Sequence, residues 1–425
     1  MPQKFSPRTW LAVVCIVTLS QIIWWNRQTH ILDLRYQTDV VQQRQQSFRP
    51  TKQKIITMPS LAIVVAGSAQ RLLFNSTVHH VIRPMNNDYV VDYFAAITLQ
   101  SGPAFRQASG YMGHLGYDPL LQPYLKNNNN NNNNSQTTND VSHIQSTLQQ
   151  VMSQAIASVS STAKLRTLRV LAQPMEDDPI LDPLREKIKT NDNNNNNNNN
   201  NDDNMYRQFP MMDRRPQALE RTHAGNKNMI RLFLLLESLW QDVETAERIR
   251  GSRYDYILFV RDDTLWLADF HLDRLLVHPN PAVTHQQQQP PDAYILSCDA
   301  RTPNMLPPEI NDHGMLIRRD RAEVVGKYVT TLVQTNLQKC HRSVTQWLGK
   351  ERGCNSEMIL KHILQEHNIQ VQLVPQSLLP FERAVVVEYK SGRKEYCFHK
   401  FCQSTEQPLT VPAGMKKCND ITSFE

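Results

Sequence analysis

The chain has 425 residues, of which 40% are hydrophobic and 20% charged, with a formal net charge of +6. This length and composition allow a sizeable buried core. The positive charges are spread along the sequence rather than gathered in one patch, so composition does not favour nucleic-acid binding. Phosphate-binding P-loop and Gly-x-Ser-x-Gly motifs are absent from the sequence, which argues against P-loop kinases and serine hydrolases.

The N-terminal part contains one long apolar segment, residues 10–25. It is slightly shorter than the ~20 residues that span a bilayer, but Trp10, Trp24 and Trp25 suit interfacial aromatic belts. A cleavable signal peptide is the alternative, although bulky rather than small residues follow the apolar region. We therefore expect residues 1–9 to be a cytosolic tail and the apolar segment to be an uncleaved transmembrane signal anchor.

Cysteines and glycosylation sequons agree with a lumenal body. Six cysteines follow the apolar segment, and all lie in the C-terminal part of the chain: Cys298, Cys340, Cys354, Cys397, Cys402 and Cys418. An even number in an oxidising compartment predicts up to three disulfides, with the connectivity left open. Their spacing lacks a repeated C-x-x-C pattern, so structural zinc is not favoured. Asn75 and Asn133 begin N-glycosylation sequons.

Composition divides the remaining chain into a stem and one folded domain. Residues 26–58 are rich in Gln and Arg and lack apolar periodicity, which is typical of a stem. The folded domain is expected at 59–425. Two Asn-rich tracts, at 127–139 and 190–205, interrupt it. Such tracts cannot bury apolar surface, so they are predicted to be disordered insertions.

Apolar runs and helical periodicities alternate through the folded domain, and this predicts an α/β sandwich with a mainly parallel sheet. Asp320 with Glu323 predicts a capped helix start, and Ser356 another. Strands are expected at 60–66, 89–94, 165–171, 256–260, 293–297, 315–317 and 369–374, helices at 78–82, 229–243, 320–332 and 356–368, and a hairpin at 384–389 and 394–398.

The most informative stretch is 254–267, where an apolar strand ends in Arg261, Asp262 and Asp263. Ligands of open α/β sheets gather beyond the carboxyl ends of such strands. Adjacent carboxylates repel one another, so a buried pair requires a compensating cation or arginine. A divalent metal that holds a diphosphate would supply this charge. In the alternative interpretation, Asp262 caps the next turn and Asp263 pairs with Arg261.

This acidic strand end resembles the metal-binding motif of nucleotide-sugar glycosyltransferases of the GT-A type. The resemblance extends over roughly residues 59–375, to a poorly characterised group of GT-A-like proteins. The similar pieces are a Gly-x-x-x-Arg turn, an Arg-Asp-Asp strand end, an Asn-Asp segment and a Ser-Glu helix start, represented here by Gly67 with Arg71, 261–263, 311–314 and 355–357.

The resemblance implies a GT-A-like fold after one transmembrane helix, in a single-pass type II protein of the Golgi or endoplasmic reticulum membrane. It also implies a nucleotide-sugar donor and a glycan, protein or lipid acceptor. Asp262 and Asp263 would bind Mn²⁺ or Mg²⁺. Donor contacts would come from Gly67, Arg71, Arg261, Asn311 and His313.

Glu357 would be the general base that deprotonates the acceptor hydroxyl, with Asp312 as the alternative base. The competing hypothesis is a non-catalytic, membrane-anchored lumenal protein of the same fold that binds carbohydrate or another partner. Nucleotide binding distinguishes the two, because a binding module has no need of UDP or GDP.

Overall fold

The computed structural model describes part of the chain, namely residues 58–69, 71–99, 118, 120–125, 138–172, 219–277, 290–298, 309–335, 356–388, 394–398 and 416–417. Within these ranges no helix is both long and apolar enough to cross a membrane. The expected anchor at 10–25, the stem up to residue 57 and the tract 190–205 lie outside the described residues. The same holds for most of the tract 127–139, since helix α5 begins at Thr138.

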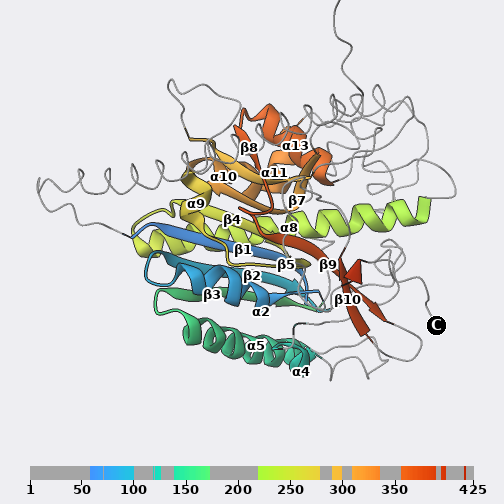
Figure 1. The fold of residues 1–425 in the computed structure, drawn as a ribbon. Coiled ribbons are helices and arrows are strands. Elements are labelled where there is room, and N and C mark those ends of the chain that lie inside the picture. Colours follow the sequence, from blue (N-terminus) through green and yellow to red (C-terminus); the bar gives the residue numbers. More distant parts are fainter. Residues whose placement is uncertain are drawn as a thin grey trace, which may run out of the picture. The chain divides into compact units, whose positions relative to one another are not determined.

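Strands and helices alternate along the described chain, as predicted (Figure 1). The strands are β1 (Ser60–Ser68), β2 (Val90–Thr98), β3 (Ala163–Leu171), β4 (Tyr256–Arg261), β5 (Thr264–Trp266), β6 (Ala293–Cys298), β7 (Glu309–Arg318), β8 (Val371–Val374), β9 (Phe381–Glu388), β10 (Lys394–Phe398) and β11 (Lys416–Lys417). The helical elements are α2 (Phe74–Thr77), η1 (Val78–Ile82), η2 (Arg83–Met85), α4 (Gln122–Leu125), α5 (Thr138–Val159), α8 (Leu219–Arg250), α9 (Leu272–Val277), α10 (Arg319–Gly326), α11 (Tyr328–Gln334) and α13 (Ser356–Glu366).

A seven-stranded sheet in the order β3-β2-β1-β4-β7-β6-β8 forms the centre of the domain. Strands β1 to β4 are mutually parallel, and β8 is parallel to β6. Only β7 among these strands runs antiparallel to its neighbours β4 and β6. The predicted mixed α/β fold with a mainly parallel sheet is therefore confirmed. Because β1 and β4 are adjacent and parallel, their carboxyl ends lie side by side.

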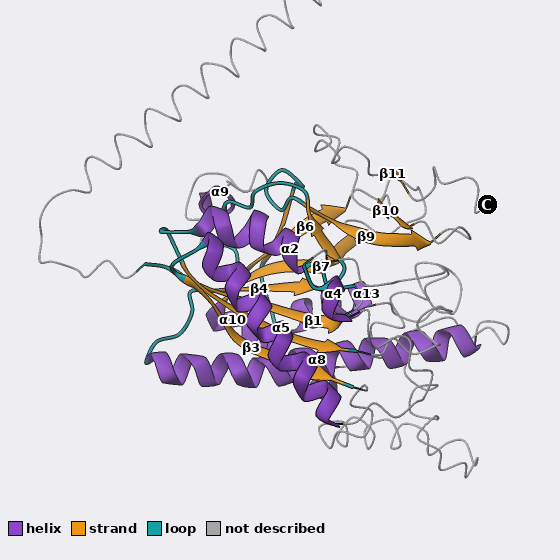
Figure 2. Ribbon diagram, turned by 90° about the horizontal axis from the view of Figure 1, so that it is seen from below, coloured by secondary structure: helices purple, strands orange, loops and turns teal. Residues whose placement is uncertain are grey.

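One face of the sheet is covered by α8, α10, α11 and α13, which share a hydrophobic core with it. Figure 2 labels α8, α10 and α13, and Figure 1 labels α11. Val64 and Phe259 point to this face and join one hydrophobic core with Trp240 of α8, Leu332 of α11 and Ile363 of α13. Alternating side chains of a strand point to opposite faces, so the neighbours of Val64 and Phe259 face the other side. Strands β1 and β4 are buried on both faces, which agrees with their near-continuous apolar runs.

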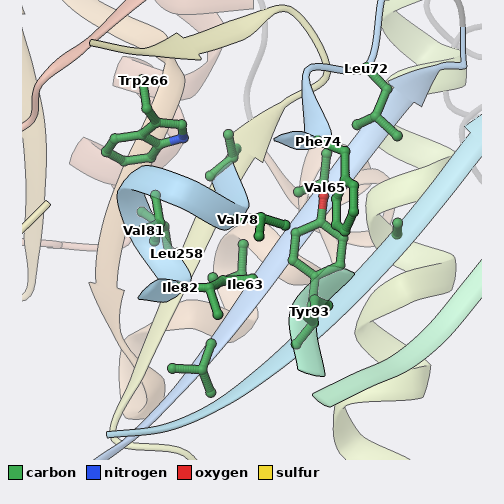
Figure 3. Close-up of a cluster of buried hydrophobic side chains, with 14 of the residues drawn as sticks. Ile63, Val65, Leu72, Phe74, Val78, Val81, Ile82, Tyr93, Leu258 and Trp266 are labelled. Atoms are coloured by element: carbon green, nitrogen blue, oxygen red, sulfur yellow. The ribbon is translucent and has the colours of Figure 1, made fainter. Parts of the chain in front are cut away.

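The opposite face carries a second hydrophobic core, part of which Figure 3 shows. Ile63 and Leu258 from the central strands pack there with Phe74 of α2 and Val78 of η1. Helices α5 and α9 contribute to the same core. A smaller sheet in the order β11-β10-β9-β5 adds Trp266 and includes the predicted hairpin, in which β9 and β10 pair antiparallel.

The helix predicted at 320–332 forms as two shorter helices, and its predicted cap is wrong. Helix α10 starts at Arg319 after the extended residue Arg318, without a side-chain cap, and Asp320 pairs with Arg318 instead (2.6 Å). It ends at Gly326, where a Cβ atom would lie 2.1 Å from Trp240 Cδ2. Close approach to the Trp240 ring requires glycine there. The chain leaves the helical conformation at Lys327 (φ −90°, ψ 53°), and α11 begins at Tyr328.

We expect Glu247→Gln to destabilise the domain by about 3 kcal/mol, because it leaves the buried guanidinium of Arg319 without its counter-charge. Both Glu247 oxygens accept hydrogen bonds from Arg319 at 2.6 Å, and both residues are buried. The matched control is Glu323→Gln, which removes an exposed pair with Lys327 (2.6 Å) and should cost less than about 1 kcal/mol. Denaturant unfolding of the two variants measures the difference, and equal costs would contradict the prediction.

Candidate active site

The carboxyl ends of β1 and β4 meet at a cluster of charged side chains. Strand β1 ends at Ser68, and Arg71 follows it in the turn. Strand β4 ends at Arg261, and Asp262 and Asp263 come directly after it. This arrangement brings acidic and basic side chains to the sheet edge at which open α/β proteins bind ligands.

The Asp262 carboxylate is 1% exposed and connects the two strand ends. Its Oδ2 accepts a hydrogen bond from the Ser68 amide (2.6 Å) and lies 2.7 Å from Arg71 Nη2. Burial raises the pKa of Asp262 above its ordinary value, although the Arg71 charge opposes this. Within the described part of the chain, Asp262 Oδ1 is buried and has no hydrogen-bond partner. A buried carboxylate oxygen without a hydrogen-bond partner is a candidate ligand atom for a cation.

Gly67 is the residue that makes room for Asp262. Its φ is +153°, and a Cβ atom in its place would lie 2.1 Å from Asp262 Cγ. From the sequence, Gly67 was predicted to allow a close approach of the nucleotide. The structure gives it a different neighbour, the Asp262 side chain.

Asp263 is 2% exposed and lies between two arginines. Arg261 donates from Nε to Asp263 Oδ1 and from Nη2 to Oδ2, each at 3.2 Å, and Arg71 Nη1 reaches Oδ2 at 3.3 Å. The remaining nitrogen, Arg261 Nη1, contacts both oxygens of Asp312 at 3.1 and 3.2 Å. Burial would lower the pKa of Arg261, but Asp263 and Asp312 together raise it, so the guanidinium is charged. Asp263 therefore pairs with Arg261, as the alternative interpretation of the acidic strand end predicted.

The third part of the cluster comes from β7 and α13. The Asn-Asp segment forms part of β7, and α13 begins at Ser356. Burial would raise the pKa of Asp312, but Arg261, His313 and a hydrogen bond from Ser356 hold it below its ordinary value. Asp312, His313 and Glu357 offer ligand atoms that all lie within 4.8 Å of one another.

His313 lies between Asp263, which follows β4, and Asp312 of β7. Its Nδ1 lies 3.6 Å from Asp263 Oδ1, and its Nε2 lies 3.8 Å from Asp312 Oδ1. Burial and the Arg261 charge lower the pKa of His313, so the imidazole is neutral at pH 7. Neutral imidazole is the form that binds metal ions. Its backbone carbonyl accepts a hydrogen bond from Thr264 Oγ1 (2.9 Å).

A cavity of about 50 Å³ adjoins the cluster on the α8 side of the sheet. Its walls are mainly apolar and come from α8, β4, β7, α11 and α13. Arg261, Asp312 and Ser356 form its polar part. This volume has room for a few water molecules, which buried polar groups can bind.

The structure brings together most of the predicted site residues: Gly67, Arg71, Arg261, Asp262, Asp263, Asp312, His313 and Glu357. The side chain of Asn311 lies outside the described residues. Ser68, Thr264 and Ser356 also contact the cluster, and none of the three was predicted from the sequence as a site residue. Only the position of Ser356, next to Glu357 at a helix start, could have indicated its role.

The comparisons with known proteins found similar solved structures but no similar sequence family. No protein-family model matches the sequence, and no curated protein matches it. Among solved structures, mouse xyloside xylosyltransferase 1 in its apo form is similar at 8% identity and a TM-score of 0.30, covering 75% of this chain and 86% of that one. The galactosyltransferase LgtC, in complex with donor and acceptor sugar analogues, is similar at 9% identity and a TM-score of 0.29, covering 74% and 73%.

Proposed function

We propose that this chain is a glycosyltransferase that moves a sugar from a nucleotide-sugar donor to a hydroxyl acceptor, with a divalent cation at the charged cluster. The observation that carries the proposal is the meeting of buried aspartates and arginines at the carboxyl ends of β1 and β4. A nucleoside diphosphate is the leaving group of such a reaction, and cations and arginines stabilise its developing charge. The motif resemblance of the sequence supports the same assignment.

The charges of the cluster fit a divalent cation. The carboxylates of Asp262, Asp263 and Asp312 contact the guanidinium groups of Arg71 and Arg261, so these side chains carry more negative than positive formal charge when His313 is neutral. Mn²⁺ or Mg²⁺ would balance this charge. Carboxylate oxygens are suitable ligands for both ions.

We assign the metal to Asp262 and Asp263 from their place after β4, with His313 as a further ligand. The ligand atoms that lie within 4.8 Å of one another in this structure are those of Asp312, His313 and Glu357. Asp262 contributes its buried, unpartnered Oδ1. His313 can serve through either ring nitrogen, because one faces Asp263 and the other faces Asp312. When bound, the cation would supply positive charge to the diphosphate. Arg71, which follows the β1 strand end, is the arginine assigned to the donor.

Glu357 is the proposed general base. Asp312 is a weaker candidate, because its pKa is lowered and both its oxygens contact Arg261. A carboxylate held in this way accepts a proton less readily. Glu357 lies in the first turn of α13, within reach of the other donor atoms of the cluster.

A non-catalytic module of the same fold remains the second candidate, and one observation favours it. Each aspartate of the cluster already has an arginine partner, so the cluster can be a structural charge network. The two candidates differ in nucleotide binding, which only the transferase requires.

We further propose that the protein is anchored in the Golgi or endoplasmic reticulum membrane by residues 10–25, with the folded domain in the lumen. The apolar segment and the oxidisable cysteine set of the sequence support this placement. The described sequon, at Asn75, lies in α2. The side chains of the six C-terminal cysteines lie outside the described residues.

Metal-dependent donor hydrolysis or transfer is the test of the proposed function. We expect the full-length protein to bind UDP or GDP more tightly with Mn²⁺, and to turn over one nucleotide sugar from a panel. EDTA should abolish turnover, and His313→Ala should weaken Mn²⁺ binding. His362→Ala is the matched control, because His362 pairs with Glu366 (3.5 Å) outside the cluster. Absence of nucleotide binding under all conditions would favour the non-catalytic module.

A further inference from the structure

Arg261 uses its whole guanidinium group to contact carboxylates of the protein itself. Nε and Nη2 form a fork on Asp263, and Nη1 contacts both oxygens of Asp312. We propose that Arg261 is a positioning residue that fixes Asp263 and the Asp312–His313 segment relative to one another, rather than a ligand of the donor diphosphate. This inference rests on the proposed function for the identity of the metal ion.

The strand pairing shows why such a bridge is needed. Pairing between β4 and β7 extends as far as Val260 opposite Gly314. Asp312 and His313 precede that pair on β7, and the Arg261–Asp312 contact joins the two strands beyond it. The Thr264 hydroxyl donates a hydrogen bond to the carbonyl of His313 (2.9 Å). Arg261 and Thr264 therefore hold the Asp312–His313 segment at two points, the Asp312 side chain and the His313 backbone.

The geometry of the contacts requires arginine rather than any cation. A guanidinium is a planar fork that bonds two carboxylates in fixed directions, whereas an ammonium is a point charge without such a fork. Groups that hold metal ligands commonly change metal affinity by roughly 10- to 100-fold when they are removed. We expect Arg261 to act on the cation in this way, through Asp263 and His313.

Two variants of the full-length protein test the inference. Arg261→Lys keeps the charge, and Arg261→Met removes it. We expect both to bind Mn²⁺ roughly 10- to 100-fold more weakly than wild type, with UDP affinity in EDTA unchanged. The matched control is Arg318→Lys at the opposite end of β7, where Arg318 contacts Asp320 (2.6 Å) and Asp292 (3.6 Å). It should leave Mn²⁺ affinity at the wild-type value.

The measurements are calorimetric titrations of Mn²⁺ alone and of UDP in EDTA, with thermal melts of each variant as a check of folding. Weaker Mn²⁺ binding by folded Arg261→Lys supports positioning by the fork. Wild-type Mn²⁺ affinity in Arg261→Lys would overturn the inference and leave the proposed function intact. A loss of metal-free UDP affinity would also overturn it, because Arg261 would then contact the donor. If wild type binds no Mn²⁺, the inference and the metal part of the proposed function both fail.

Discussion

Asp263→Asn is expected to abolish sugar transfer and to lower the stability of the domain in the same protein. If Asp263 were an exposed metal ligand, its replacement would abolish transfer and leave stability unchanged. Asp263 is instead 2% exposed and contacts Arg71 and Arg261 through its two oxygens. The amide removes a charge that two partly buried guanidinium groups share. Breaking a buried ion pair from one side costs about 3 kcal/mol, which lowers Tm by roughly 5 °C or more.

The control for this variant is Asp269→Asn, which removes an aspartate with comparable partners on the surface. Asp269 is 40% exposed and contacts His80 (2.9 Å) and Arg83 (3.4 Å). Exposed pairs of this kind contribute less than about 1 kcal/mol, so Tm should change little. Thermal melts and Mn²⁺ titrations of both variants separate the two effects. If Asp263→Asn keeps both wild-type Tm and wild-type Mn²⁺ affinity, Asp263 neither stabilises the domain through its ion pairs nor binds the metal.

The sequence predicted strands β1 and β4 of the central sheet well because both are buried on both faces. The runs at 60–66 and 256–260 are almost wholly apolar, and they form β1 and β4. The end of the second run in Arg261 and two aspartates predicted a candidate site at the carboxyl edge, where the structure has a charged cluster. Both signals are local, so each could be interpreted from a few neighbouring residues.

Long-range contacts account for what the sequence did not predict. The strand predicted at 315–317 belongs to β7, which begins at Glu309 and runs antiparallel between β4 and β6. The Asn-Asp segment consequently lies in a strand, and His313 is buried. Neither the direction of a strand nor its neighbours follow from its own residues, so the contact of Arg261 with Asp312 could not be anticipated.

The same limit applies to the arginines. A sequence shows that Arg71 and Arg261 are near the acidic strand end, but not which groups their nitrogens contact. The structure pairs both with aspartates of the cluster. From its position alone, such an arginine would be assigned to a diphosphate. The structure shows that it can bind a carboxylate of the protein instead.

Gly67→Ala, in β1, is expected to displace the Asp262 side chain that follows the neighbouring strand β4. The new methyl group would lie 2.1 Å from Asp262 Cγ and 2.3 Å from Asp262 Oδ2, so Asp262 must move. Its hydrogen bond from the Ser68 amide and its contact with Arg71 would be lost with that movement. Strain at φ +153° adds to the collision, and the combined cost is on the order of 2–5 kcal/mol.

Gly251→Ala separates the strain of an unusual backbone from the collision with Asp262. Gly251 has a φ of +70°, and no atom lies within 4 Å of the position that its Cβ would take. We expect this control to lose about 1 kcal/mol and to keep wild-type Mn²⁺ and UDP affinities. Gly67→Ala should lose more stability and should bind Mn²⁺ at least about 10-fold more weakly, because its displaced carboxylate is a proposed ligand. Equal losses of stability in the two variants, with Mn²⁺ affinity retained in both, would show that Asp262 adapts to the added methyl group and that its position is not what the site requires.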